Sequence, residues 1–141
     1  MTATPSSILA LDVGAKRVGV AIASLAALLP RPLITLPRQG DFWVLLQNIV
    51  EIEGVTTIIV GLPRGLSGQH TAQTRIIEAF AAELRTHFAM PVHFQDEALT
   101  SHRAQAELEA RGRDYDRGDI DALAATYILE DFLANDKVVS A

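Results

Sequence analysis

The chain of 141 residues carries 12 basic and 17 acidic side chains, a formal net charge of -5, 49% hydrophobic residues and no cysteine. Its length predicts one compact domain, and its apolar content argues against a disordered chain. The missing cysteines exclude disulfides and thiolate metal sites and favour a reducing compartment, so we expect a cytoplasmic protein.

No segment predicts a membrane span or an export signal. The longest run without a charge, residues 18–30, is shorter than the roughly 20 apolar residues that cross a bilayer. The first seven residues carry no basic side chain, and Asp12 interrupts the apolar stretch that follows. We therefore expect a soluble protein without a membrane partner, in which residues 1–141 form a single domain and residues 1–6 and 136–141 are flexible ends.

Charge is unevenly distributed along the chain. Residues 1–40 hold four cations and one acid, whereas residues 96–121 hold four arginines and eight acids. The acidic total argues against a protein that simply coats DNA. The carboxylates of the later segment form either a solvated helix face or part of a functional site, and charge counts alone do not decide between the two interpretations.

The first 40 residues predict a meander of three strands. Residues 8–12 are an apolar run that ends in an acid, and a short connection containing Gly14 leads to the apolar, β-branched run 18–23. Two such runs across a short glycine-containing connection indicate a β-hairpin. After two prolines, residues 33–36 predict a third, short strand.

A change of period at Asp41 predicts the first helix. Apolar side chains then recur at steps of three and four residues until Gly54, with Asp41 as the N-cap. Residues 57–61 contain no charge and indicate a strand that is buried on both faces. The apolar stripe of the helix consists of Phe42, Leu45, Leu46, Ile49 and Ile52.

The second half of the chain predicts three helices and one strand. Residues 71–88 are helical by pattern, and residues 92–95 form a fifth strand. A helix capped by Thr100 or Ser101 runs to residue 111, a polar segment 112–118 follows, and Asp119 caps a last helix to residue 134. Strands alternating with helices after a meander predict an α/β fold, with a mixed five-stranded sheet covered by helices on both faces.

Three acids stand where a purely structural explanation is weak. Asp12 ends the first strand, at the edge of an α/β sheet where ligands bind, although it could instead bond the backbone of the turn. Glu97 follows the fifth strand, although it or Asp96 could simply place a charge near a helix N-terminus. Asp121 lies in line with the apolar residues at positions 124, 125, 128 and 132 of the last helix.

Convergence of Asp12, Glu97 and Asp121 would require a cation, because three neighbouring carboxylates repel one another and otherwise bind protons. Magnesium and manganese prefer oxygen ligands and commonly bridge protein carboxylates to a substrate phosphate. The four histidines show no paired metal-ligand spacing, which argues against zinc. We therefore expect an oxygen-rich site for Mg²⁺ or Mn²⁺.

Four segments together resemble one known family. Residues 11–21, residues 60–63 leading to Gly68, residues 96–101 and residues 120–125 resemble the YqgF family, in the right order and at ordinary spacing. Its members are small bacterial proteins of ribonuclease H-like fold, described as Holliday junction resolvase-like and as nucleases that mature the 5′ end of pre-16S ribosomal RNA. The resemblance covers nearly the whole chain.

The resemblance implies a ribonuclease H-like sheet with an antiparallel second strand, and Asp12, Glu97 and Asp121 as catalytic, metal-binding acids. With two ions bound, the reaction would be phosphodiester hydrolysis, in which one ion activates water and the other stabilises the leaving oxygen. The family usually has arginine after the glutamate, where this chain has Ala98. A cation that contacts phosphate or orients a carboxylate is therefore missing at that position.

Several cations flank the predicted acids. Lys16 and Arg17 in the first hairpin and Arg64 in the loop after the fourth strand are candidates for binding the phosphate backbone, although exposed cations in turns are also common without such a role. The arginines at positions 111, 113 and 117 could close over a duplex or simply keep a loop soluble. With so few cations, we expect weak and strongly salt-dependent binding.

The expected function is metal-dependent nuclease activity in 5′-end processing of pre-16S rRNA. One alternative is a Holliday junction resolvase-like DNA endonuclease, which would need a dimer because the junction is two-fold symmetric. Another is a non-catalytic nucleic-acid-binding module of the same fold. The expected partner is thus structured RNA or branched DNA, and the protein is a monomer or a homodimer. The hairpin at Gly14 also resembles the phosphate loop of actin-like proteins and sugar kinases, but those clamp ATP between two such domains.

Overall fold

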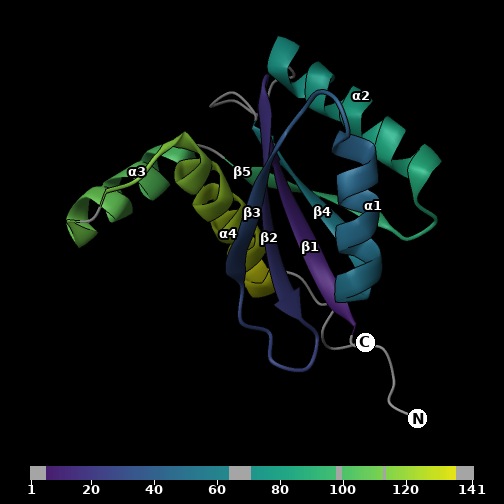
Figure 1. The fold of residues 1–141 in the computed structure, drawn as a ribbon, viewed down its shortest axis with the longest axis horizontal. Coiled ribbons are helices and arrows are strands. Elements are labelled where there is room, and N and C mark those ends of the chain that lie inside the picture. Colours follow the sequence, from purple (N-terminus) through teal and green to yellow (C-terminus); the bar gives the residue numbers. More distant parts are fainter. Residues whose placement is uncertain (1–5, 64–70, 98–99, 113, 136–141) are drawn as a thin grey trace.

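The computed structural model describes residues 6–63, 71–97, 100–112 and 114–135. The predictions for Arg64, Ala98 and Arg113, and for most of the two chain ends, fall outside these ranges; Ser6 accepts a hydrogen bond from the amide of Leu25 (2.9 Å). None of the helices in the described ranges has the length and apolar character of a membrane span. The elements follow in the order β1 (Ser7–Val13), β2 (Arg17–Ser24), β3 (Arg31–Pro37), α1 (Phe42–Glu53), β4 (Val55–Pro63), α2 (Ala72–His87), β5 (Val92–Glu97), α3 (Thr100–Arg111) and α4 (Arg117–Asn135) (Figure 1).

The strands form one sheet in the order β3-β2-β1-β4-β5. β2 runs antiparallel to β1 and β3, whereas β1, β4 and β5 run parallel to one another. The predicted mixed five-stranded sheet and its antiparallel second strand are therefore confirmed. Because the carboxyl ends of parallel strands meet at one edge of a sheet, Val13, Pro63 and Glu97 end at the same edge.

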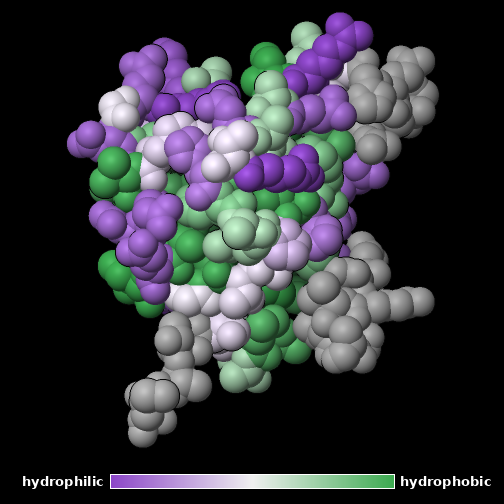
Figure 2. Space-filling view, turned by 90° about the vertical axis from the view of Figure 1, so that its right-hand side faces the viewer, coloured by the Kyte–Doolittle hydropathy of each residue, from purple (hydrophilic) through white to green (hydrophobic). Residues whose placement is uncertain are grey.

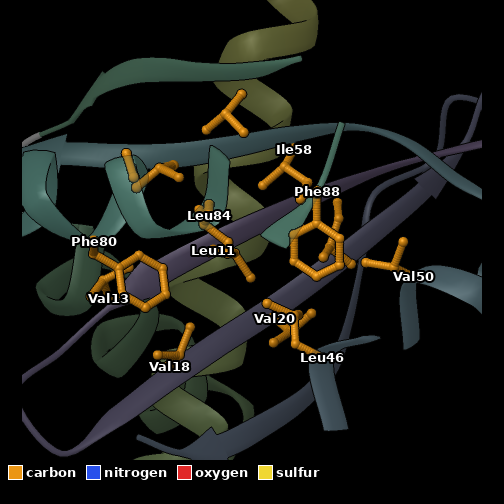
Figure 3. Packing of buried hydrophobic residues seen from close by; sticks show 14 of the residues in the cluster. Leu11, Val13, Val18, Val20, Leu46, Val50, Ile58, Phe80, Leu84 and Phe88 are labelled. Atoms are coloured by element: carbon orange, nitrogen blue, oxygen red, sulfur yellow. The ribbon is translucent and has the colours of Figure 1, made fainter. Parts of the chain in front are cut away.

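Helices cover both faces of the sheet, as predicted (Figure 1). α1 and α2 pack on one face, where Leu11 and Val20 of the strands share a core with Leu46 and Phe80 (Figure 3). α4 packs on the opposite face, against a second core. Side chains alternate between the two faces along a strand, so Asp12 faces α4. The strand residues of this second core are Ile8, Ala10, Ala21, Ala23 and Ile59.

The face of the sheet beneath α4 is lined with small residues at the points of closest approach. A Cβ at Gly19 of β2 would overlap the carbonyl group of Asp121, and a Cβ at Gly61 of β4 would overlap the side chain of Ile128. The backbone of α4 therefore lies directly on β2. Glycines at these two positions therefore allow α4 to pack closely on the sheet.

The starts of α3 and α4 differ from the prediction. α4 begins before Asp119, and the carboxylate of Asp116 accepts a hydrogen bond from the amide of Asp119 (2.9 Å). The carboxylate of Asp119 in turn accepts a hydrogen bond from the amide of Asp116 (3.1 Å). Asp116 is thus the N-cap and Asp119 the third helical residue, an exchange typical of a capping box. α3 already includes Thr100 and Ser101, so its cap falls on a residue outside the described ranges.

The ends of α1 and α2 show which predicted caps form. Asp41 precedes α1 but its side chain makes no capping hydrogen bond, whereas Gly54 ends the helix in the left-handed conformation that glycine favours. Thr71, predicted as the first helical residue, is instead the N-cap of α2, in a reciprocal exchange with Thr74. Asp41 has the residue type of an N-cap but a backbone conformation (φ -85°, ψ 19°) outside the extended region in which caps usually lie.

α1 buries a narrower stripe than its spacing predicts. Phe42, Leu46 and Val50, one residue per turn, are its buried residues. Leu45 and Ile52 belong to the predicted stripe but are exposed, Ile52 by 77%. The helix contacts the sheet along a single row of side chains, and hydrophobic side chains are therefore visible among hydrophilic ones on the side of the molecule where α1 lies (Figure 2).

Candidate active site

A cavity of about 360 Å³ lies at the carboxyl edge of the parallel strands. It is lined by all three acids that the sequence indicates: Asp12 of β1, Glu97 of β5 and Asp121 of α4. The two strand residues reach it because their strands are parallel, and Asp121 reaches it because α4 begins at the same edge. Other lining residues are Val13, Gly14, Gly61, Pro63, Gln73, Ile77, His102 and Ile128.

Asp12 is opposite Gly19 in the ladder between β1 and β2, on the side of the sheet that α4 covers. Burial, and to a smaller extent the negative charge of Asp121, raises the pKa of Asp12 from 3.8 to about 7. The two acids are therefore near enough to repel each other. A proton or a cation between them would stabilise the site.

Asp121 is held by Arg17. The Nε of Arg17 donates a hydrogen bond to Oδ2 of Asp121 over 2.6 Å, and the side chain of Asp121 is 18% exposed. This ion pair ties the first residue of β2 to α4. Arg17, a predicted phosphate contact, is thus bound to one of the predicted catalytic acids, whereas Lys16 is exposed in the connection between β1 and β2.

Glu97 ends β5 on the wall of the cavity, and its side chain is 8% exposed. Burial, followed by the hydrogen bond and the charge of Asp131, raises the pKa of Glu97 to about 8. Arg103 and Gln95 act in the opposite direction and lower the pKa. Glu97 therefore lines the same cavity as the other acids but lies beside Asp131, a carboxyl group that the sequence motifs do not indicate.

The donor atoms suit a hard divalent ion. Within the described residues, no three acidic or imidazole side chains are gathered tightly enough to hold one ion together. The structure instead brings Asp12 and Asp121 together and sets Glu97 beside Asp131. Carboxylate oxygens are nevertheless the ligands that Mg²⁺ and Mn²⁺ prefer. An ion between Asp12 and Asp121 would offset the repulsion that contributes to the raised pKa of Asp12.

Arg38, which no sequence motif indicates, supports the turn at Gly14 in the cavity wall. Its Nη1 donates a hydrogen bond to the carbonyl of Gly14 (3.0 Å), its amide donates to the carbonyl of Lys16 (2.9 Å), and its guanidinium lies over the ring of Phe80. Arg38 thereby fixes the turn that follows Asp12. The sequence feature that could have indicated Arg38 is its position directly after β3, because the last residue of β3 pairs with the first residue of β2.

Two polar side chains that the sequence motifs do not indicate also line the cavity. Gln73 and His102 lie in the first turns of α2 and α3, which both begin at the carboxyl edge of the sheet.

The arginines near the start of α4 differ in their contacts. Arg111 forms an ion pair with Glu107 one turn earlier in α3. Arg117 is exposed as the first residue of α4. Of the three arginines that could close over a duplex, Arg111 is thus already paired.

The fold and the acids define the class of this protein. A mixed five-stranded sheet with an antiparallel second strand, two acids at its carboxyl edge and a third carried there by a helix form a ribonuclease H-like nuclease domain. The sequence model of the RuvX family, described as Holliday junction resolvase, matches residues 6–135, and the chain belongs to this family. RuvX is another name of the YqgF family, so the predicted family is confirmed. The protein is therefore a nuclease, a hydrolase that acts on ester bonds.

Curated relatives match over nearly their whole length. A protein of Moorella thermoacetica is 38% identical over 133 residues, which cover 89% of this chain and 93% of the relative. A protein of a Roseiflexus species is 35% identical over 139 residues, covering 94% of this chain and 97% of the relative. The names of both relatives describe candidate pre-16S rRNA nucleases.

A solved structure shares the fold. The RuvC protein of Thermus thermophilus, in complex with a Holliday junction substrate, aligns with a TM-score of 0.55 over 92% of this chain and 95% of that chain. The aligned sequences are 14% identical. The similarity therefore concerns the arrangement of the strands and helices, and it confirms the predicted ribonuclease H-like fold.

Proposed function

We propose that this protein is a divalent-metal-dependent nuclease that cleaves structured RNA during maturation of the 5′ end of pre-16S rRNA in the cytoplasm. The observation that carries the proposal is the cavity at the carboxyl edge of the sheet, which Asp12, Glu97 and Asp121 line together. Acids in such an arrangement serve phosphodiester hydrolysis when divalent ions offset their repulsion. The names of the relatives support RNA as the substrate.

Asp12, Asp121 and Glu97 would hold the ions. Asp12 is best placed to contact two ions because β1 is the strand between the other two acids. On one side is β2, on which α4 with Asp121 lies, and on the other side is β4, which pairs with β5 and Glu97. When bound, two Mg²⁺ or Mn²⁺ ions supply a water of lowered pKa and stabilise the leaving oxygen. Because its pKa is raised to about 7, Asp12 would have to lose a proton before it could serve as a ligand.

The cations of the β1–β2 connection would bind the substrate backbone. Lys16 is exposed beside the cavity and is free to contact a phosphate by its charge. Arg17 orients Asp121 through its Nε and would meet the substrate next to the reacting phosphate. Arg64 is a third proposed phosphate contact, by its place in the chain after β4.

Branched DNA is the second candidate substrate, because the family is described as Holliday junction resolvase. The two substrates differ in what they demand of the protein. Paired cleavage of a two-fold symmetric junction requires a dimer, whereas cleavage of one RNA strand requires one site. The oligomeric state under cleavage conditions therefore separates the two activities.

Cleavage assays with matched acid variants test the proposal. A 5′ precursor fragment of 16S rRNA and a four-way DNA junction are incubated with wild type, Asp12→Asn, Asp121→Asn and Glu97→Gln in Mn²⁺. We expect each variant to lose at least about a hundredfold in rate on the RNA, since even groups that only support metal ligands are worth about 10- to 100-fold. Glu83→Gln, an exposed acid of α2, is the control.

Two outcomes would contradict the proposal. Faster cleavage of the junction than of the RNA, by a dimer, would establish the DNA substrate. Equal inactivity of wild type and all three acid variants, with binding of nucleic acid retained, would establish a non-catalytic binding module. Active wild type with inactive acid variants and an active Glu83→Gln variant supports the nuclease site.

A further inference from the structure

Glu97, whose side chain is 8% exposed, lies between the cavity and charged side chains of α3 and α4. Its carboxyl group lies beside that of Asp131, which is about one turn beyond the cavity-lining Ile128 of α4. Nη1 of Arg103 lies 3.3 Å from Oδ2 of Asp131 and 4.0 Å from Oε2 of Glu97. A residue of α3 and a residue of α4 therefore converge on the carboxyl group that ends β5.

Arg103 is itself held in place. Its guanidinium lies over the ring of Tyr127, with Cζ 4.4 Å from the ring centroid. The hydroxyl of Tyr127 donates a hydrogen bond to Glu107 over 2.6 Å, and the ring is buried in the contact between α3 and α4. Stacking on a fixed ring restricts a side chain that would otherwise be mobile in solvent. The charge beside Glu97 is thus part of a rigid contact between two helices.

We propose that Arg103 and Asp131 are positioning residues for Glu97, which hold its carboxyl group in the cavity wall and determine how it meets a divalent ion bound at Asp12 and Asp121. The inference rests on the proposed function, because it assigns the pair a role only if Glu97 is a ligand. Arg103 and Asp131 contact neither the other two acids nor, by this proposal, the substrate.

Stability alone does not account for the arrangement. The side chains of Arg103 and Asp131 are 48% and 34% exposed, and ion pairs with such exposure add little to stability. Solubility alone would not require Arg103 to lie beside Glu97, whose side chain is only 8% exposed. Groups that support metal ligands commonly change metal affinity or activity by about 10- to 100-fold. The pair is therefore expected to matter more for the site than for the fold.

The test uses truncating and conservative variants of the full chain. Arg103→Ala and Asp131→Ala should each lower kcat by about tenfold or more, while the KM for nucleic acid changes by less than about twofold. Arg103→Lys and Asp131→Asn should recover kcat to within about threefold, because an ammonium keeps a positive charge beside Glu97 and an amide can donate a hydrogen bond to it. Glu130→Gln, an exposed acid next to Asp131, is the control for charge removal on α4.

Binding of Mn²⁺ to the metal-free protein, measured by calorimetry, gives a readout that does not depend on activity. We expect Arg103→Ala and Asp131→Ala to weaken binding by about tenfold and the conservative variants to restore it. Wild-type Mn²⁺ affinity and wild-type kcat in both alanine variants would overturn the positioning role. If wild type binds Mn²⁺ but cleaves no nucleic acid, the proposed function fails, and the calorimetric comparison still decides the role of the pair.

Discussion

Gly19 of β2 and Asp121 of α4 meet backbone to backbone. A Cβ at position 19 would overlap the carbonyl of Asp121 and lie 2.9 Å from the amide nitrogen of Ala122. Asp12 is the ladder partner of Gly19. The absence of a side chain at Gly19 therefore lets α4, which carries Asp121, lie close to β1, which carries Asp12.

Gly19→Ala should consequently disrupt both the fold and the site. The obstacle is helix backbone, which cannot move aside as a side-chain end can, so we expect a loss of about 3 kcal/mol or more in the free energy of unfolding, at the upper end of overpacking effects. Urea unfolding measures the loss. A variant that retains wild-type stability and Mn²⁺ affinity would show that α4 is not held against β2 in solution.

Gly61→Ala provides a contrast, because its added Cβ would meet the Cδ1 atom of Ile128, the end of a flexible side chain. We expect a smaller loss of about 1 to 2 kcal/mol. Ile128→Val removes that atom at a cost of about 1 kcal/mol on its own. The double variant should lose less stability than the sum of the two single variants, as urea unfolding of all four proteins would measure. Strict additivity would contradict the contact.

The sequence alone predicts two of the site acids and the face of the sheet on which α4 packs. The interruption of apolar patterns by Asp12 and Asp121 indicates two of the site residues, because a carboxylate on a buried stripe needs a partner. A further signal lies in the alternation of β2, where Gly19, Ala21 and Ala23 share one face and larger residues share the other. Such alternation predicts which face of the sheet a helix approaches closely.

Other contacts depend on how separate helices pack and cannot be obtained from patterns. Asp116 and Asp119 both suit a helix start, and only the exchange of hydrogen bonds decides between them. The contacts of Arg17 with Asp121 and of Glu97 with Asp131 join residues of different elements through side-chain rotamers. Residue type and spacing constrain neither contact.

The stability of the metal-free protein should fall as the pH rises from 5 to 8. The folded-state pKa values of Asp12 and Glu97 are raised to about 7 and about 8, from 3.8 and 4.5. Between the ordinary and the raised values the folded state binds more protons than the unfolded state, so stability is lost with rising pH. Thermal unfolding in chelator measures this slope, and Asp12→Asn should make it shallower below about pH 7.

Glu83→Gln, whose side chain is exposed on α2, should leave the slope unchanged. Divalent ions should stabilise the wild type more at pH 8 than at pH 6, because they compete with protons for the same carboxylates. The same pH slope in wild type and Asp12→Asn would mean that Asp12 is ionised at neutral pH without a metal.

Arg17→Gln should strengthen binding of Mn²⁺ to the metal-free protein. Arg17 neutralises Asp121, and an incoming cation has to share or displace this partner. Since the side chain of Arg17 is 35% exposed and its charge is partly screened, we expect a gain on the order of three- to tenfold in affinity by calorimetry. Arg31→Gln, at the opposite end of the sheet, is the matched control. Weaker Mn²⁺ binding in Arg17→Gln would show that Arg17 orients Asp121 more than it competes with the ion.

Lys16→Ala should weaken RNA binding without changing the chemical step. Lys16 is exposed beside the cavity, so its contact with phosphate is electrostatic and releases counterions. Removing one such contact lowers the slope of log affinity against log salt by about 0.7 for a single strand and about 0.9 for a duplex. Binding titrations between low and moderate salt measure the slope, and single-turnover cleavage at saturating protein should stay at the wild-type rate. Arg31→Ala keeps the wild-type slope if only the carboxyl edge contacts RNA. An unchanged slope in Lys16→Ala would place the path of the nucleic acid away from the β1–β2 connection.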